Sequence, residues 1–467
     1  MKPPVYLSTS ACIHSGKGGK GLRRFLFTSL TIIIATFALA SRGDERDRDD
    51  KHSIARNVVY LTSNNPEPGK NSVLAYRRNP TTGGLTLLGN FPTKGTGFYN
   101  NDERLGPDDS DQEIVASEDR RFLFAVNSGS DTVAVFEINA DGSLTHVKGS
   151  PFPSGGVQPV SLGLDGHHRL FVVNKGNLEP GQTGGANPNY TGFRVSGAGR
   201  LNPIRESTVE VAPGSHPTQA LIAPGGKLIF GVNLFTYYFP PPPGFPPFAP
   251  SYASALESFV IRPGGQLTQG ANTPQPIPLP PPFPPFMLGL QTHPTEPLLY
   301  VGYVLGGVLA TYRYDQAGTL TFLNAAPTTG LGLCWIEVNE SGTIAYTSNS
   351  TDDSVSVFSL ADPSKPVEIQ KLDLNGPKGF LPCPGPAPCG PVIYNTTPFQ
   401  LELDPTGKFL FVLNHETTQN DSFPDGNALH VLKVGADGKV TEAPTFPTIL
   451  PQNLVPPRAH PKGVIVL

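Results

Sequence analysis

The stretch DRRFLFAVNSGSDTVAVFEINADGSL, residues 119–144, decides the fold of this chain. It holds two short runs rich in valine and phenylalanine, FLFAVN and TVAVFEI, and each run is followed by glycine, serine, asparagine or aspartate. Runs of this kind, bounded by turn residues, are typical of β-strands joined by tight turns. The stretch therefore predicts two antiparallel strands and the start of a third.

The second strand of this unit has the pattern aromatic-x-x-Asn, in which asparagine stands three positions after an aromatic residue, and this pattern recurs along the chain. Seven copies are present, at residues 58–64, 122–128, 170–175, 228–234, 298–304, 344–350 and 409–415. Asparagine stands at the same place in five of them, as Asn127, Asn174, Asn233, Asn349 and Asn414, and Ser63 and Tyr303 occupy it in the others. Repetition in unit after unit indicates a structural hydrogen bond at a strand end and not a ligand.

Each copy continues into an alternating third strand and, after a glycine-rich turn, into a fourth. Seven units of four antiparallel strands predict an all-β, seven-bladed β-propeller. A first strand precedes only six of the units, and the seventh candidate, KGVIVL, stands at residues 462–467. We expect this C-terminal strand to pair with the first unit and close the ring, which removes open sheet edges.

Composition agrees with this architecture and excludes several classes of protein. The 51 glycines and 52 prolines among 467 residues argue against a helical bundle, while 38% hydrophobic residues suffice for a large core. Only 15% of the residues are charged and the formal net charge is -4, so a nucleic-acid partner is not expected.

Residues 1–40 are typical of a signal peptide, because basic residues precede an apolar run and the small-residue site Ala38-Leu39-Ala40. The pair Arg23-Arg24 resembles a twin-arginine export signal, and an uncleaved leader would act as a membrane anchor. We expect residues 41–56 to be a charged flexible linker and residues 57–467 to be the propeller. The mature protein is then extracytoplasmic, periplasmic or secreted, does not span a membrane, and is expected to be a monomer.

An exported chain favours disulfide formation, and Cys383 and Cys389 bracket a short loop in which we expect a disulfide. Cys334 lies in an apolar run and is interpreted as a buried free thiol. No further cysteine or histidine stands near the loop, so we expect no metal and no cofactor.

The long insertions between strands fall on one face of the predicted propeller, which we call the first face, whereas the hairpins of the second face are short. Two of the insertions are proline tracts with interspersed aromatic residues, at 239–250 and 274–286. Such tracts favour extended polyproline II segments. They are interpreted either as a wall or lid beside the central opening or as two tracts that pack on each other.

The units at residues 119–144 and 404–440 resemble the seven-bladed lactonase family, which includes bacterial 6-phosphogluconolactonases and fungal muconate-lactonising enzymes. The resemblance spans about residues 57–467. It implies the propeller fold and chemistry on a lactone ring. Catalytic members often open their first strands with Pro-Arg-His, but the matching positions here, 159–161, 217–219 and 398–400, contain neither arginine nor histidine.

The residues expected around the first-face opening are therefore mostly polar and nearly neutral; they are Glu113, Ser161, Gln219, Gly289, Trp335, Gln400 and Gly463. Opening a lactone needs a base that activates water and donors that stabilise the oxyanion. We assign Glu113 as the base and Gln219 and Gln400 as donors. The predicted ligand-binding residues are Ser161, His216, Trp335, His415 and Arg458. The competing interpretation is that each of these residues is a structural polar group or a solvated loop residue.

A nearly neutral opening suits an unphosphorylated sugar-type or other small lactone better than a phosphorylated one. The first hypothesis is thus a lactone hydrolase. The alternative is a non-catalytic envelope propeller that binds a glycan or a protein through its proline-rich and aromatic loops.

Overall fold

The computed structural model describes residues 55–99, 110–178, 182–238, 252–278, 286–304, 306–376, 396–417 and 423–467. All of them belong to one compact unit, His52–Leu467. The predicted signal peptide, nearly all of the linker, the Cys383–Cys389 disulfide and the proline tract at 239–250 lie outside the described residues. Those four assignments remain predictions.

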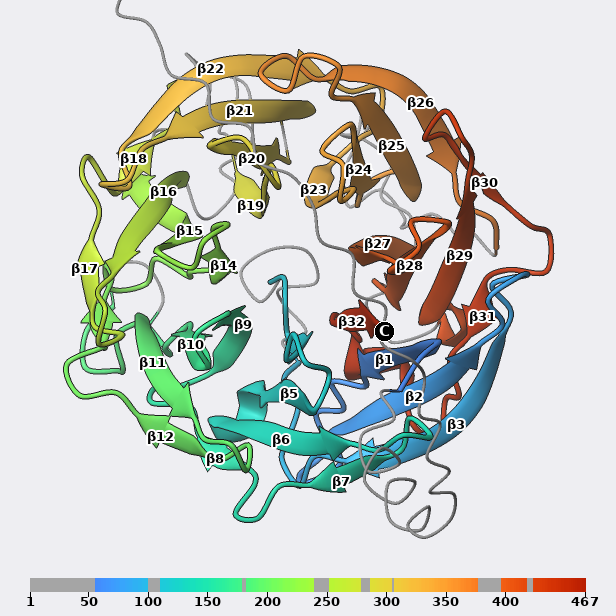
Figure 1. Ribbon diagram of the computed structural model, residues 1–467, viewed down its shortest axis with the longest axis horizontal. Helices are drawn as coiled ribbons and strands as arrows, with labels where there is room; N and C mark the ends of the chain where they lie inside the picture. Colours follow the sequence, from blue (N-terminus) through green and yellow to red (C-terminus); the bar gives the residue numbers. More distant parts are fainter. Residues whose placement is uncertain are drawn as a thin grey trace, which may run out of the picture. The chain divides into compact units, whose positions relative to one another are not determined.

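Seven antiparallel sheets surround a common axis, as the sequence predicts (Figure 1). The innermost strands, in ring order, are β32 (Val464–Val466), β4 (Ile114–Ala116), β9 (Pro159–Asp165), β14 (Leu221–Ile222), β19 (Met287–Thr292), β23 (Leu333–Val338) and β27 (Thr396–Leu403). The second strands are β1 (Val58–Thr62), β5 (Phe122–Asn127), β10 (Arg169–Asn174), β15 (Leu228–Tyr238), β20 (Leu298–Tyr303), β24 (Ile344–Asn349) and β28 (Phe409–Glu416). The third strands are β2 (Ser72–Arg78), β6 (Thr132–Ile138), β11 (Asn189–Val195), β16 (Tyr252–Ile261), β21 (Val308–Tyr314), β25 (Ser354–Ser359) and β29 (Ala428–Val434).

The outermost edge differs among the blades. Three blades end in one long strand, namely β3 (Leu85–Pro92), β22 (Leu320–Pro327) and β26 (Val367–Asp373). Four end in two short strands, namely β7 (Leu144–His146) with β8 (Phe152–Pro153), β12 (Leu201–Pro203) with β13 (Val209–Glu210), β17 (Leu267–Gln269) with β18 (Gln275–Pro276), and β30 (Val440–Glu442) with β31 (Thr448–Ile449). We had expected the whole proline tract at 274–286 to lie in a first-face loop. Its start instead completes a blade edge, because β18 pairs with β16.

The C-terminal strand closes the ring as predicted. β32 pairs antiparallel with β1, with Val466 opposite Val59 and Val464 opposite Leu61. The backbone amide of Leu467 also donates to the carbonyl of Val58 at 2.9 Å. The first and last segments of the described chain therefore share one blade, which leaves no unpaired inner edge.

The core lies between neighbouring blades. One cluster joins Phe411 and Leu413 of β28 to Val59 and Leu61 of β1, and all four side chains are buried. Burial of a large aliphatic or aromatic side chain contributes about 1.5–3 kcal/mol. Contacts of this kind repeat around the ring and hold each blade against the next.

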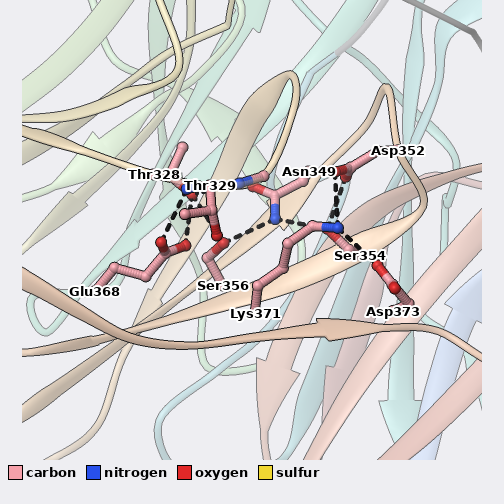
Figure 2. A network of polar contacts seen from close by, with 10 residues as sticks. Thr328, Thr329, Asn349, Asp352, Ser354, Ser356, Glu368, Lys371 and Asp373 are labelled. Carbon is pink, nitrogen blue, oxygen red and sulfur yellow. Dashed lines mark hydrogen bonds and ion pairs between the residues drawn. The ribbon is translucent and has the colours of Figure 1, made fainter.

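The recurrent asparagines are structural, as the sequence analysis proposed. Figure 2 shows Asn349 donating through Nδ2 to the hydroxyls of Ser354 and Ser356, both at 2.9 Å. The linker between β22 and β23 passes directly over this asparagine, so that a side chain in place of Gly330 would overlap it. Gly95 and Gly156 pack in the same way on Asn127 and Asn174. In these three blades the asparagine at the strand end and the glycine in the linker above it thus pack as a pair.

The same figure shows how polar side chains fasten that linker. Glu368 accepts a hydrogen bond from the Thr328 hydroxyl at 2.7 Å and from the Thr329 amide at 2.8 Å. Lys371 pairs with Asp352 and Asp373 at 3.1 and 2.7 Å. The contacts of Glu368 bind the linker to the outermost strand of the blade that it enters, and Lys371 connects the same strand to the turn that follows Asn349.

Helix is almost absent from the described residues, which contain three short 3-10 helices, η2 (Ser128–Ser130), η3 (Pro424–Gly426) and η4 (Pro457–Ala459). None of these helices could cross a membrane.

Candidate functional site

The inner strands are irregular where they open on the first face. In β19 the register shifts between Met287 and Leu290, so the strand carries one residue more than its partner. Shifts at the equivalent place occur in β9, β23 and β27. Such bulges turn side chains away from their regular alternation and are frequent beside active sites. The first-face opening is therefore one place where the propeller departs from simple repetition.

A second irregularity marks four consecutive inner strands, β32, β4, β9 and β14. Each is entered through a residue with positive φ that is not glycine, namely His460 (46°), Gln112 (63°), Gln158 (58°) and His216 (50°). This left-handed conformation is uncommon for residues with a Cβ atom and is often found at functional sites. It places long polar side chains at the entry of these strands.

The predicted base Glu113 lies at this opening, between β4 and β32. Its side chain is buried, and its Oε1 accepts a hydrogen bond from the Ser110 hydroxyl at 3.1 Å. Gly463 packs against it, since a Cβ atom at that glycine would lie 3.1 Å from the Cβ of Glu113. The carboxylate therefore faces the junction of two blades.

The two predicted donors, Gln219 and Gln400, join neighbouring blades. The Gln219 side chain makes two hydrogen bonds to the backbone of Leu290 in β19. Its Oε1 accepts from the Leu290 N–H at 2.8 Å, and its Nε2 donates to the Leu290 carbonyl oxygen at 3.0 Å. Nε2 also lies 3.3 Å from Oδ2 of Asp111. Gln400 Oε1 accepts from the Val464 amide of β32 at 2.9 Å. Both hydrogens of Gln219 are thus engaged, which differs from the role of a free oxyanion donor.

Ser161 makes the same kind of contact, because its Oγ accepts from the Ala220 amide at 3.0 Å. His216 is buried and its Nε2 lies 3.2 Å from the Leu178 carbonyl. Arg458 is half-exposed at the rim, where it pairs with Glu67 at 3.6 Å. These three predicted ligand-binding residues therefore contact different parts of the first face.

Trp335 and His415, in contrast, lie in one aromatic cluster. The Phe399 ring stands between them, with its centroid 4.9 Å from that of Trp335 and 5.0 Å from that of His415. His460 packs on the other side of His415 at 4.8 Å. The apolar residues that surround Trp335 and Phe399 are Leu234, Leu288 and Cys334. Cys334 is buried and forms no disulfide, as expected.

Sequence reasoning missed the charged residues beside this cluster. The Lys462 ammonium lies 6.0 Å from the Phe399 ring centre, and Glu416 Oε2 lies 4.0 Å from Nε2 of His460. Burial, assisted by the charge of Lys462, lowers the pKa of His415 to about 3. The segment Pro461-Lys462-Gly463 before the last inner strand was the available signal. The opening therefore carries a cation that the expected neutral ring did not include.

Carboxyl groups line the channel below the opening. In each blade one inner-strand residue lies opposite the aromatic residue of the second strand, and we call it the aromatic-paired position. It is Gln291, Glu337 and Glu402 in β19, β23 and β27. It is Ile465, Val115, Gly163 and Leu221 in β32, β4, β9 and β14. The channel thus has a polar half and an apolar half.

The carboxyls of the polar half influence one another and Asp111. Burial, reinforced by the negative charge of Asp111, raises the pKa of Glu337 to about 8. Burial likewise raises the pKa of Asp111 to about 7, and burial together with Glu337 and Asp111 raises that of Glu402 well above its usual value. Gln291 Nε2 donates to Glu337 at 3.3 Å. The sequence signal was a polar residue at the same position of consecutive strands.

Two cavities open on the second face. One, of about 530 Å³, is lined by Arg56, Arg78 and Arg120, and the other, of about 700 Å³, is bordered by the hairpins near Ser341, Thr406 and Asp437 and reaches Glu337. Neither includes a residue that we predicted as catalytic or ligand-binding. In the described ranges, no three histidine, cysteine or acidic side chains are arranged to hold a metal ion.

A family model described as "Lactonase, 7-bladed beta-propeller" matches residues 55–182 and 288–417. No curated protein sequence matches the chain. Among solved structures, the chain is similar to a putative 6-phosphogluconolactonase from Bacteroides fragilis, with 16% identity, a TM-score of 0.58, and coverage of 88% of this chain and 97% of that one. A second such protein, from Bacteroides uniformis, gives 15% identity, a TM-score of 0.60, and coverage of 88% and 98%. A protein from Lactobacillus plantarum has 16% identity and a TM-score of 0.54, with coverage of 88% of this chain and 98% of that one. Identities this low carry the fold alone.

Proposed function

Because the chain belongs to the seven-bladed β-propeller lactonase family, we propose that it is an exported hydrolase of an unphosphorylated sugar-type or other small lactone. The reaction would take place at the first-face opening. The observation that carries the proposal is the presence there of a buried carboxylate, Glu113, packed against the residue that follows Lys462.

The geometry supports a simple sequence of steps. The Glu113 carboxylate takes a proton from a water molecule while the water oxygen bonds to the lactone carbonyl carbon. The negative charge that develops on the carbonyl oxygen is stabilised by the nearby ammonium of Lys462. The ring carbon–oxygen bond then breaks, and the departing oxygen receives the proton held by Glu113. The product is a hydroxy acid.

Gln219 and Gln400 contribute to this site by holding the inner strands in register. Their amides bond to Leu290 and Val464, so they position the walls of the opening instead of contacting the reacting atoms. A phosphorylated substrate would favour several cations in bidentate arrangements. Lys462 is the cation that we find beside the aromatic cluster, which favours a substrate without phosphate.

The second candidate is a non-catalytic propeller that binds a glycan or a protein. The observation in its favour is that the amide of Gln219 is fully engaged, so this predicted oxyanion donor is not available to a substrate. The two proposals differ in whether a covalent bond is broken.

The test is hydrolysis of a panel of phosphorylated and unphosphorylated lactones by the full chain, followed by titration of the acid released. We expect turnover of unphosphorylated lactones, and we expect Glu113→Gln to lower kcat at least about 100-fold because the base is lost. Glu257→Gln is the matched control, since Glu257 is equally buried but bonds to Asn233 in another blade. No turnover on any lactone would reject the hydrolase and leave the binding propeller.

Export is a separate part of the proposal and rests on residues 1–40. We expect the protein recovered from the extracytoplasmic fraction to begin near Ser41, as shown by its intact mass. Retention of Met1 in a membrane fraction would show instead that the leader is an uncleaved anchor.

A further inference from the structure

Two buried polar atoms of the aromatic cluster have no hydrogen-bond partner among the described residues. They are Nε1 of Trp335 and Nε2 of His415, and both side chains are 0% exposed. Buried polar side-chain atoms nearly always have a partner in the protein, in a bound water or in a ligand. Two such atoms on either side of one ring, Phe399, call for an explanation.

The chemistry of the two atoms is complementary. Nδ1 of His415 lies 3.0 Å from the Glu416 carbonyl oxygen, which can only accept, so Nδ1 carries the hydrogen. Nε2 of the neutral ring is therefore an acceptor, and the lowered pKa keeps it so at physiological pH. Trp335 Nε1–H is a donor only. The cluster thus offers one donor and one acceptor.

The cluster lies just below the surface of the opening. Its inner members are buried, but Phe286 and Val304, which pack against it, are partly exposed. His460 and Lys462, at the entry of β32, border it on the side toward Glu113. Because both side chains are 0% exposed, a ligand at the opening reaches the two atoms only by displacing part of this rim.

We propose that Trp335 and His415 determine specificity by reading two oxygen functions of the ligand. Trp335 Nε1–H donates to a carbonyl or ring oxygen, and His415 Nε2 accepts from a hydroxyl. The ligand is accordingly a hydroxylated lactone or the related polyhydroxy acid, and not an unsubstituted lactone. This inference rests on the proposed function for the location of the site, but it requires binding only.

Intrinsic fluorescence tests the proposal directly, because Trp335 is the single tryptophan of the chain. The full chain is mixed rapidly with freshly dissolved glucono-δ-lactone and, in parallel, with δ-valerolactone, which has no hydroxyl groups. We expect a saturable change in emission with the hydroxylated lactone at concentrations where the unsubstituted one has no effect. A site built to hydrogen-bond a hydroxyl discriminates strongly against the analogue that lacks it.

Substitution of the acceptor provides the second arm. We expect His415→Phe to raise the Kd of glucono-δ-lactone at least about tenfold, the loss of one buried hydrogen bond. His415→Gln, which retains an acceptor oxygen, should recover part of the affinity and guards against misfolding of the first variant. His430→Gln is the matched control, because His430 is buried in the same blade but bonds to Glu442.

The outcomes are distinct. Three results would overturn the proposal: an equal emission change with both lactones, no emission change with either, or an unchanged Kd in His415→Phe. Each of them would favour a buried water between the two atoms. Hydrolysis without an emission change rejects this inference and leaves the lactonase. An emission change without hydrolysis rejects the lactonase and retains the recognition of a hydroxylated ligand.

Discussion

The two halves of the central channel are built alike but differ in chemistry. At the aromatic-paired position, β32, β4, β9 and β14 carry apolar residues or glycine, and β19, β23 and β27 carry an amide and two carboxyls. The apolar half is also the half whose strands begin with a left-handed residue. Blades that share one fold can therefore differ at inner positions, because packing between blades constrains their outer and middle strands more than the lining of the channel.

The two halves meet at two seams, one between β14 and β19 and one between β27 and β32 (Figure 1). A glutamine spans each seam. Gln219, at the entry of β14, bonds to Leu290 of β19, and Gln400 of β27 bonds to Val464 of β32. The residues that we predicted as donors thus hold together the parts of the ring that differ most. Three experiments sharpen or break this comparison.

The largest effect is expected from giving the apolar half a carboxyl. Val115→Glu places an acid opposite Phe124, where partial burial among apolar side chains penalises the charged form. We expect a loss of about 3 kcal/mol in unfolding free energy at pH 8, and a smaller loss at pH 5, where the new group is protonated. Denaturant unfolding at both pH values measures it. Val115→Leu is the control, and equal stability of the acidic variant would show that the two halves do not differ in environment.

An intermediate effect is expected at the seam. Gln219→Ala leaves the amide and carbonyl of Leu290 without their partner, and we expect a loss of about 2 kcal/mol in unfolding free energy. Gln400→Ala, which removes one bond to Val464, should cost about 1 kcal/mol. Urea titration compares the two variants. If both are as stable as the parent chain, the seams do not depend on these amides.

The smallest effect concerns the carboxyls of the polar half together with Asp111, which precedes β4. Since the folded-state pKa values of Glu337 and Asp111, about 8 and about 7, are raised, the folded state holds their protons more tightly than the unfolded state. Their stabilisation is complete at low pH and is lost as the pH rises to about 8. His415 opposes this trend only below its unfolded pKa of about 6.5, so above pH 6.5 the slope comes from the raised carboxyls, which also include Glu257, whose pKa burial raises to about 7.

Glu402→Gln removes one of these like charges. We expect the variant to be more stable than the parent chain by a margin that grows as the pH rises from about 4.5 and reaches at least about 1 kcal/mol at pH 8.5, and we expect the pKa values of its neighbours to be lower. Thermal unfolding across this range measures the slope. Glu137→Gln, on the exposed face of β6, is the control. An unchanged slope would show that the three carboxyls do not share a charge environment.

Much of the fold was predictable because local patterns repeat. The apolar runs predicted the second strands, and the absence of a first strand before residue 58 predicted closure by residues 462–467, which the pairing of β32 with β1 confirms. The recurrent asparagines were predicted as structural, and the bonds of Asn349 confirm this. The family resemblance was confirmed by the matching family model.

The site was less predictable. Glu113, Trp335 and Gln400 were placed at the opening by counting along the inner strands, but one-residue bulges change where side chains point. The contact of Gln219 with Leu290 joins residues 71 positions apart, and that of Gln400 with Val464 joins residues 64 apart. No local sequence pattern indicates such a contact. The role of these two glutamines in joining neighbouring blades could therefore not be predicted from the sequence.

The sequence by itself determined the number of blades, the four-strand unit and the manner of closure, because each depends on hydrophobic periodicity and turn residues within a few tens of residues. The tertiary structure alone decided which side chains share the opening. It placed Lys462 and His460 beside His415, and Asp111 beside Glu337 and Glu402. The physical reason is ring closure, which brings the ends of all seven inner strands to one axis and makes distant residues neighbours in a low-dielectric channel.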